Sequence, residues 1–245
     1  MRYMSMKLVS VNIEGGKHLD TVDAFLERED ADVVCLQECF GDTIESLSRS
    51  YPFQLYTPTY VTDQDENGLV EGERVWGEVI MSKVPLINTR MDYFPMDGYG
   101  PDNLPKYGQD NHVICLLRAR VGEMDIGTIH FTWTPKSTIT ARQRDHMKLL
   151  LKLIEQEDLI LCGDFNIARG NEMYQELTRV MQDNIPSGVE TTVDPLLHYA
   201  NKSTPGKLKL VVDYVWSTPR YKVSEVKVVS GVSDHCAIVC EIAKS

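Results

Sequence analysis

The stretch that most constrains the fold is LILCGDFNIARG, residues 159–170. Its first four residues are apolar or neutral, so they predict a buried strand that runs up to Gly163. Asp164 and Asn166 then follow two positions apart. A carboxylate and a carboxamide at the end of a buried strand are costly unless they are paired or bind something. The stretch therefore predicts a strand whose end forms part of a site.

Other apolar, strand-like segments carry polar side chains in the same way. They are Asn12 in SVNIEG, Glu38 in VCLQE, His130 in IGTIHFTW, Asp213 in LVVDYVW, and Asp234 with His235 in GVSDHCAIV. Each of these groups would be costly to bury without a partner or a ligand. The simplest physical account is that these strand ends converge on one site.

Taken one at a time, most of these residues also have an ordinary structural explanation. The alternatives are a turn cap (Asn12), a strand-edge charge (Glu38), a core histidine (His130), an Asx-turn (Asp164 with Asn166) and a helix cap or turn (Asp234 with His235). Asp213 is harder to explain in this way, because its apolar neighbours leave the carboxylate in need of a partner. Together, the ordinary explanations require six separate coincidences.

The rest of the chain alternates many strand-like runs with few helical ones. Strands are predicted at 7–13, 32–38, 78–83, 112–121, 124–132, 158–165, 209–217, 226–231 and 236–242, and helices at 18–29, 137–157 and 171–183. The segments 57–76 and 91–111 are expected to be long and irregular. Since no repeat, low-complexity tract or linker divides the chain, we expect one domain over 1–245, with two packed sheets and helices outside.

Composition sets limits on the class of protein. The chain has 245 residues, 42% of them hydrophobic, and a formal net charge of −11. This acidity argues against non-specific binding of duplex DNA, which relies on many Lys and Arg contacts to phosphate. No apolar run is long enough for a membrane span or resembles a secretory signal, so a cytoplasmic location is expected. The six cysteines lie in apolar runs and are interpreted as core residues.

The order of the motifs LQE, GDFN and SDH, with an early strand Asn, a mid-chain strand His and a DYV strand, resembles the endonuclease/exonuclease/phosphatase superfamily. The resemblance extends from Asn12 to His235. It implies the deoxyribonuclease I-like fold, an α+β, four-layer α/β sandwich of two packed mixed β-sheets flanked by helices. It also implies metal-dependent hydrolysis of a phosphoester, with Mg2+ as cofactor and Mn2+ as a substitute.

The resemblance assigns one group of residues to the metal and the attacking water. Glu38 is the expected metal ligand, with Asn12 beside it as a direct or water-mediated contact and Asp234 as a further ligand. Asp164 orients and deprotonates the water, and Asn166 holds the water or a phosphate oxygen. Strand alternation is expected to place Asp164 and Asn166 on the same side.

A second group is assigned to the phosphate. His235 would donate a hydrogen bond to a non-bridging oxygen, while Asp213 accepts its other N–H and raises its pKa. His130 would be a second histidine on the phosphate, and Glu78 in WGEVIMSK is a candidate partner for it. A solvent-edge Glu is the alternative for Glu78.

The substrate is less constrained. Tyr99 and Tyr107 in the 91–111 segment, with Trp133 after His130, could stack nucleobases, or could merely anchor their loops. We expect a nuclease or phosphodiesterase acting on nucleic-acid ends or single strands. A phosphatase or phosphodiesterase on small or lipid phosphoesters, and a non-catalytic scaffold, are the alternatives. No obligate protein partner is expected.

Overall fold

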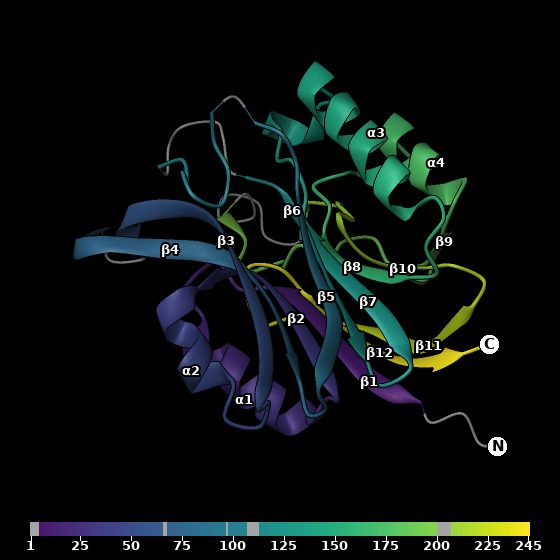
Figure 1. The fold of residues 1–245 in the computed structure, drawn as a ribbon, viewed down its shortest axis with the longest axis horizontal. Helices are drawn as coiled ribbons and strands as arrows, with labels where there is room; N and C mark the ends of the chain where they lie inside the picture. The colour runs from purple at the N-terminus through teal and green to yellow at the C-terminus, as the bar shows by residue number, and fades with distance from the viewer. Residues whose placement is uncertain (1–4, 66–67, 97, 107–112, 200–206) are drawn as a thin grey trace.

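The chain is described by a computed structural model that covers residues 5–65, 68–96, 98–106, 113–199 and 207–245. Within these residues the strands form two six-stranded sheets. The sheets pack face to face, and helices cover their outer faces (Figure 1). The architecture is an α+β sandwich of two mixed sheets flanked by helices, as the sequence predicts.

The first sheet contains both ends of the described chain. In order across the sheet, its strands are β11 (Tyr221–Val229), β12 (Ala237–Lys244), β1 (Met6–Asn12), β2 (Val33–Phe40), β4 (Gly68–Ser82) and β3 (Phe53–Asp65). Strand β1 is parallel to β2 and antiparallel to β12.

The second sheet is built from the middle of the chain. In order, its strands are β5 (Leu86–Tyr93), β6 (Cys115–Val121), β7 (Met124–His130), β8 (Ile160–Asp164), β10 (Asp213–Ser217) and β9 (Gln182–Asp183). Strands β7 and β8 are parallel, and β10 is antiparallel to β8.

The helices form the two outer layers of the sandwich. Helices α1 (Leu19–Glu29) and α2 (Ile44–Leu47) lie on the first sheet, and α3 (Ala141–Ile154) and α4 (Glu172–Thr178) lie on the second (Figure 1). Helix α1 connects β1 to β2, and α3 connects β7 to β8. Parallel neighbours require such crossover connections, so these two helices follow from the strand directions.

Strand alternation explains how the core is shared between the layers. In β1, Leu8 belongs to the core cluster between the two sheets, while Val9 and Val11 pack with Phe25 and Leu26 of α1. Adjacent residues of a strand point to opposite faces, so a continuously apolar strand is suited to burial on both sides. All six cysteines are buried and free, which confirms their interpretation as core residues.

The strand directions bring the polar strand ends to one edge of the sandwich. Asn12 ends β1, and Glu38 lies near the end of its parallel neighbour β2. In the second sheet, Asp164 at the end of β8 pairs in register with both His130 and Asp213. The expected convergence therefore follows from the pairing of these strands.

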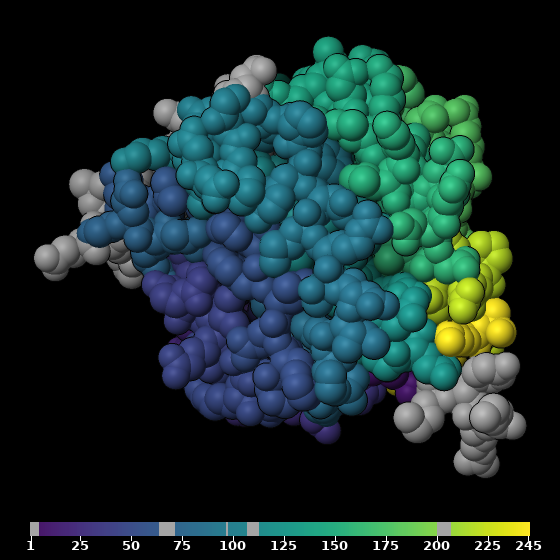
Figure 2. Space-filling model, viewed as in Figure 1, coloured from purple at the N-terminus to yellow at the C-terminus, as the bar shows by residue number. Residues whose placement is uncertain are grey.

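The expectation of an irregular segment at 57–76 was wrong. Strands β3 and β4 continue through it as a long antiparallel ribbon, which extends beyond the sheet (Figure 1) and forms one end of the molecule in the space-filling view (Figure 2). A ribbon that leaves the core needs no apolar face, so its sequence lacks the pattern by which a buried strand is identified.

The two edge strands of the second sheet, β5 and β9, were not predicted from the sequence. Strand β5 occupies 86–93, the first three residues of the segment 91–111 included, and most of its side chains are exposed. Helix α4 ends at Thr178 instead of 183, because the chain there enters the short edge strand β9. None of the helices in the described part of the chain combines the length and apolarity needed to cross a membrane.

Candidate active site

The end of β8 is shaped by a glycine. Gly163 has a φ of +133°, and a Cβ atom at this position would lie 2.1 Å from the carbonyl oxygen of Ile129. Only glycine allows β8 to approach β7 this closely. Asp164 follows with 2% of its surface exposed. Its Oδ1 accepts a hydrogen bond from the backbone N–H of Asn166 at 2.9 Å, so the Asx-turn exists and leaves Oδ2 facing the site.

Asn166 reaches the site by a turn and not by strand alternation. Strand β8 ends at Asp164, and Asn166 has a left-handed backbone with a φ of +52°. Its Nδ2 donates to the carbonyl oxygen of Phe131 at 3.0 Å. The intervening Phe165 is fully buried in the core. The expected cause, strand alternation across residues 164–166, was therefore wrong.

Asn12 joins two carboxylates at the end of β1. Its Nδ2 donates to Glu38 Oε1 at 3.0 Å and to Asp164 Oδ2 at 3.2 Å. Its Oδ1 accepts from the backbone N–H of Glu14 at 3.1 Å. In this arrangement the amide positions the two carboxylates, and its oxygen is turned to the backbone instead of into the site.

Glu38 is aimed by an irregularity in β2. The pairing of β2 with β4 shifts between Leu36 and Cys39, and Glu38 has a φ of +55°. Such bulges redirect a side chain and are concentrated at functional sites. The pKa of Glu38 is raised to about 8, mainly by burial. The nearby carboxylate of Asp234 also raises this pKa, and its effect is larger than the lowering caused by the hydrogen bond from Asn12.

His235 is held by a carboxylate. Its Nδ1 lies 2.9 Å from Oδ2 of Asp213, and its Nε2 lies 3.8 Å from Oδ2 of Asp164. Burial lowers the pKa of His235, but the charges of Asp213 and Asp164 and the Asp213 hydrogen bond outweigh this effect and raise it well above the usual value. The expected pairing of Asp213 with His235 is present in the structure.

His130 faces the same carboxylate from the other side. Its Nε2 lies 3.7 Å from Asp164 Oδ2 and 3.6 Å from Glu38 Oε1. Burial lowers the pKa of this histidine, and Asp164 offsets only part of that effect. The pKa values of the two histidines are therefore shifted in opposite directions.

Glu78 is placed differently from the prediction. It lies in β4 with 1% of its surface exposed, so it is not a solvent-edge residue. Among the described residues, neither of its carboxylate oxygens has a hydrogen-bond partner, and so the expected pairing with the His130 ring is not formed. Burial raises the pKa of Glu78 well above its usual range, and the nearby His130 backbone offsets this only in part.

Sequence reasoning missed a third histidine at this site. His198 is buried, and its ring lies 5.9 Å from that of His235 in an edge-to-face arrangement. One ligand atom from each of His198, Asp234 and His235 lies within 4.8 Å of the other two. The segment DPLLH (194–198) carried a signal, since an Asp-Pro start predicts a turn whose end holds the histidine.

The aromatic rim is described in part. Trp133 is 51% exposed and Tyr99 is half-buried, while Tyr107 lies outside the described residues. Tyr199, which the sequence reasoning did not select, is 63% exposed and its ring centroid lies 4.5 Å from that of His198. Exposed aromatic side chains thus follow both His130 and His198 along the chain.

The donor set fits a hard divalent cation. Glu38, Asp164, Asp213 and Asp234 bring four carboxylates to one edge, and burial raises the pKa of Glu38 and of Asp234. Raised pKa values show that the negative charges are poorly compensated by the protein alone. Carboxylate oxygens are ligands that Mg2+ prefers, and a bound cation would supply the missing charge.

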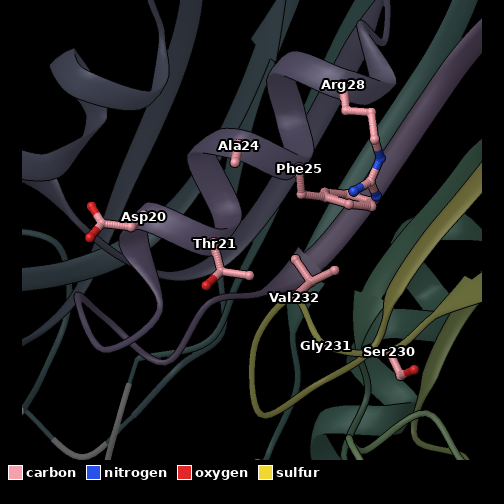
Figure 3. A pocket seen from close by; sticks show the side chains of 8 residues that line it. All are labelled: Asp20, Thr21, Ala24, Phe25, Arg28, Ser230, Gly231 and Val232. Carbon is pink, nitrogen blue, oxygen red and sulfur yellow. The ribbon is translucent and has the colours of Figure 1, made fainter.

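A separate hollow is bordered by the residues that precede the SDH motif. It has a volume of about 400 Å³ and lies between α1 and residues 230–232 (Figure 3). Asp20 and Arg28 point from the helix near its two ends. None of the predicted site residues lines it, so the hollow is distinct from the carboxylate and histidine cluster.

Comparison with known proteins identifies the family and agrees with the fold. The chain belongs to the Endonuclease/Exonuclease/phosphatase family, which its sequence matches over residues 9–235. Members of this family hydrolyse phosphoesters. No curated protein matches the sequence closely enough to identify a nearer relative.

Several solved structures share the fold. An endonuclease/exonuclease/phosphatase from Beutenbergia cavernae aligns with a TM-score of 0.76 at 19% identity, covering 100% of this chain and 72% of that one. The mannosyl-6-phosphatase of Bacteroides thetaiotaomicron aligns with a TM-score of 0.65 at 14% identity, covering 97% and 99%. The human Nocturnin catalytic domain aligns with a TM-score of 0.65 at 17% identity, covering 98% and 94%.

Proposed function

We propose that this protein is a Mg2+-dependent phosphodiesterase that acts on nucleic-acid ends or single strands. The observation that carries the proposal is the convergence of Asp164, Glu38 and the Asp213–His235 pair at one edge of the sandwich. Hydrolysis of a phosphoester needs an oriented water, a donor to the phosphate oxygens and compensation of negative charge. The gathered side chains include a candidate for each requirement.

Glu38 and Asp234 would hold the cation, with Asn12 keeping Glu38 in place through its amide. When bound, the divalent cation supplies Lewis-acid polarisation of the phosphoryl group and offsets charge on the leaving oxygen. Asp164 would orient the attacking water through Oδ2, the oxygen that the Asx-turn leaves available. Asn166, fixed by its bond to Phe131, would limit where that water lies.

The histidines would contact the phosphate. His235, with its raised pKa, would donate from Nε2 to a non-bridging oxygen while Asp213 fixes the ring. His130 would contact a second oxygen as a neutral imidazole, because burial lowers its pKa. One charged and one neutral donor would hold the phosphate between them.

The exposed aromatic side chains and the net charge support a substrate with unpaired nucleic-acid bases. Trp133 and Tyr199 are exposed beside the two histidine-bearing segments, where they could stack the bases next to the scissile phosphate. The net charge of −11 disfavours a long duplex held by its backbone. An unpaired end or a single strand fits both observations.

The test is a panel of substrates assayed with Mg2+, with Mn2+ and with EDTA. It includes bis-p-nitrophenyl phosphate, p-nitrophenyl phosphate, a single-stranded oligonucleotide and an abasic duplex. We expect metal-dependent cleavage of bis-p-nitrophenyl phosphate and of the oligonucleotide, and a lower rate on the monoester.

Other outcomes of the assay would contradict the proposal. Preferential hydrolysis of the monoester would replace the diesterase proposal with a phosphatase on small phosphoesters. No cleavage in the presence of bound Mg2+ would exclude these substrates, and no cleavage without metal binding would favour the non-catalytic scaffold.

A further inference from the structure

A single turn, residues 194–198, positions His198. Oδ1 of Asp194 accepts hydrogen bonds from the backbone N–H groups of Leu196 and Leu197, both at 2.8 Å. An Asp side chain that caps the following backbone in this way fixes a tight turn. His198 closes the turn, and its N–H donates to the carbonyl oxygen of Asp194 at 3.4 Å.

This turn is tied to the loop that carries Asp234 and His235. The backbone N–H of Asp194 donates to the carbonyl oxygen of Asp234 at 2.7 Å, and Oδ2 of Asp194 accepts from the backbone N–H of Gly231 at 2.6 Å. Val193 also forms an isolated bridge with His235. These bonds fix the position of His198 relative to the other two side chains, so the cluster does not depend on a free loop.

The three side chains each offer one metal-ligand atom. His198, Asp234 and His235 are all buried, with ligand atoms within 4.8 Å of one another. Asp213 binds Nδ1 of His235, which leaves Nε2 as the atom that can coordinate. A carboxylate behind a ligating imidazole is the usual way in which proteins orient a metal-binding histidine.

The chemistry of this set differs from that of the oxygen-rich cluster around Glu38. Two imidazole nitrogens and one carboxylate suit Zn2+ better than Mg2+, which prefers oxygen ligands. Ligands about 2.0–2.1 Å from a tetrahedral Zn2+ lie about 3.4 Å apart, so the cluster needs to close by roughly an ångström or less per atom.

We propose that His198, Asp234 and His235 form a second cation site that binds Zn2+, next to the Mg2+ site at Glu38 and sharing the Asp234 carboxylate with it. A Zn2+ ion there takes the place of the proton on Nε2 of His235. The expected effect on activity rests on the proposed function. With Zn2+ bound, Nε2 of His235 no longer donates to the phosphate, so Zn2+ should inhibit hydrolysis supported by Mg2+.

The test measures binding directly, apart from activity. Metal-free protein is titrated with Zn2+ by calorimetry, and with Co2+ by its visible absorption, in the presence of excess Mg2+. The wild type should bind one equivalent with the absorption of nitrogen-ligated Co2+. His198→Phe keeps a ring against Tyr199 and His235 but removes both ring nitrogens. It should weaken Zn2+ binding more than 100-fold, whereas loss of a residue that only orients a ligand costs roughly 10–100-fold.

Three variants keep the result interpretable. His198→Gln repeats the test with a polar side chain if the Phe variant melts at a lower temperature. Leu196→Ala changes an exposed side chain of the same turn and should bind Zn2+ like the wild type. Glu38→Gln should lose Mg2+ binding and keep Zn2+ binding, because Glu38 belongs to the other cluster.

The outcomes separate this inference from the proposed function. Wild-type affinity for Zn2+ in both folded His198 variants, or loss of Zn2+ binding in Glu38→Gln, would overturn the second site. Zn2+ binding through His198 in a protein that hydrolyses none of the phosphoesters would support the site and remove the proposed function. Mg2+-dependent hydrolysis without any Zn2+ binding would do the reverse.

Discussion

The two histidines that face Asp164 are supported in opposite ways. His235 has Asp213 within hydrogen-bonding distance of Nδ1, at 2.9 Å. Glu78, near the backbone of His130, is buried as deeply as Asp213, but its carboxylate forms no hydrogen bond with the His130 ring. The nearest atoms of the two histidines are almost equally far from Asp164, at 3.8 and 3.7 Å. The two histidines are thus nearly equidistant from Asp164, but only His235 has a carboxylate hydrogen-bonded to its other ring nitrogen.

This difference determines the charge of each ring. A hydrogen-bonded, ionised carboxylate favours the imidazolium, so the pKa of His235 is raised. Glu78 has no such bond, and burial favours its neutral form, so it adds little to the field at His130, whose pKa is lowered. A carboxyl group near a histidine therefore does not by itself raise the pKa of that histidine. The effect depends on whether the carboxyl group is ionised and hydrogen-bonded to the ring.

Asp164→Asn tests the residue shared by both sides and should have the largest effect. The variant keeps the size and the Oδ1 acceptor that bonds the backbone of Asn166, but it loses the charge that faces the two histidines and the water. We expect kcat/KM with Mg2+ to fall by about 10³-fold or more, in the range for loss of a general base. Thermal unfolding should show a folded protein, and a rate within tenfold of wild type would contradict the assignment.

Asp213→Asn should break the asymmetry. Without the carboxylate, the pKa of His235 falls, because burial is no longer offset by its closest charge. His235 must be protonated to donate to phosphate, so activity should be lost at a lower pH: the alkaline limb of the kcat/KM profile moves to lower pH. At neutral pH the rate should fall on the order of 10²-fold.

The pH profile is the part of this experiment that a merely structural role would not change. If Asp213 only stabilised the fold, the variant would lose activity equally at all pH values and its melting temperature would fall in parallel. An unchanged alkaline limb would mean that the Asp213–His235 pair does not set the charge that catalysis uses.

The sequence predicted the inner strands and the site better than the periphery, and the reason is physical. A strand buried on both faces is continuously apolar, so a polar residue such as Asp213 within it stands out in the sequence as a candidate for the site. The β3–β4 ribbon and β5 have exposed faces, and their sequences carry no such contrast.

Two features of the site depend on backbone conformation or on long-range packing. Asn166 is oriented by a left-handed turn, which strand alternation does not predict. His198 joins the site because Asp194 bonds to Asp234 and Gly231, far away in the sequence. Neither the orientation of Asn166 nor the contact between the two loops can be inferred from residue spacing. The motifs GDFN and DPLLH predict only where the turns lie.

Glu78→Gln sharpens the comparison and should have the smallest effect on turnover. Because the pKa of Glu78 is raised by burial, the carboxyl group is already protonated at moderate pH, and an amide of the same size replaces it with little change. The pKa is about 4.3 in the unfolded chain, so wild-type stability should fall relative to the variant as pH rises from there toward the higher folded pKa.

Urea unfolding in EDTA at pH 5 and pH 8 measures this effect. The free energy of unfolding of Glu78→Gln relative to wild type should rise by at least about 1 kcal/mol between the two pH values, a change that a pKa shift of less than one unit already produces. Glu45→Gln, on exposed α2 surface, is the matched control. A variant with the pH dependence of wild type, together with an altered pKa of His130 by NMR, would mean that Glu78 is ionised and that its charge acts on His130.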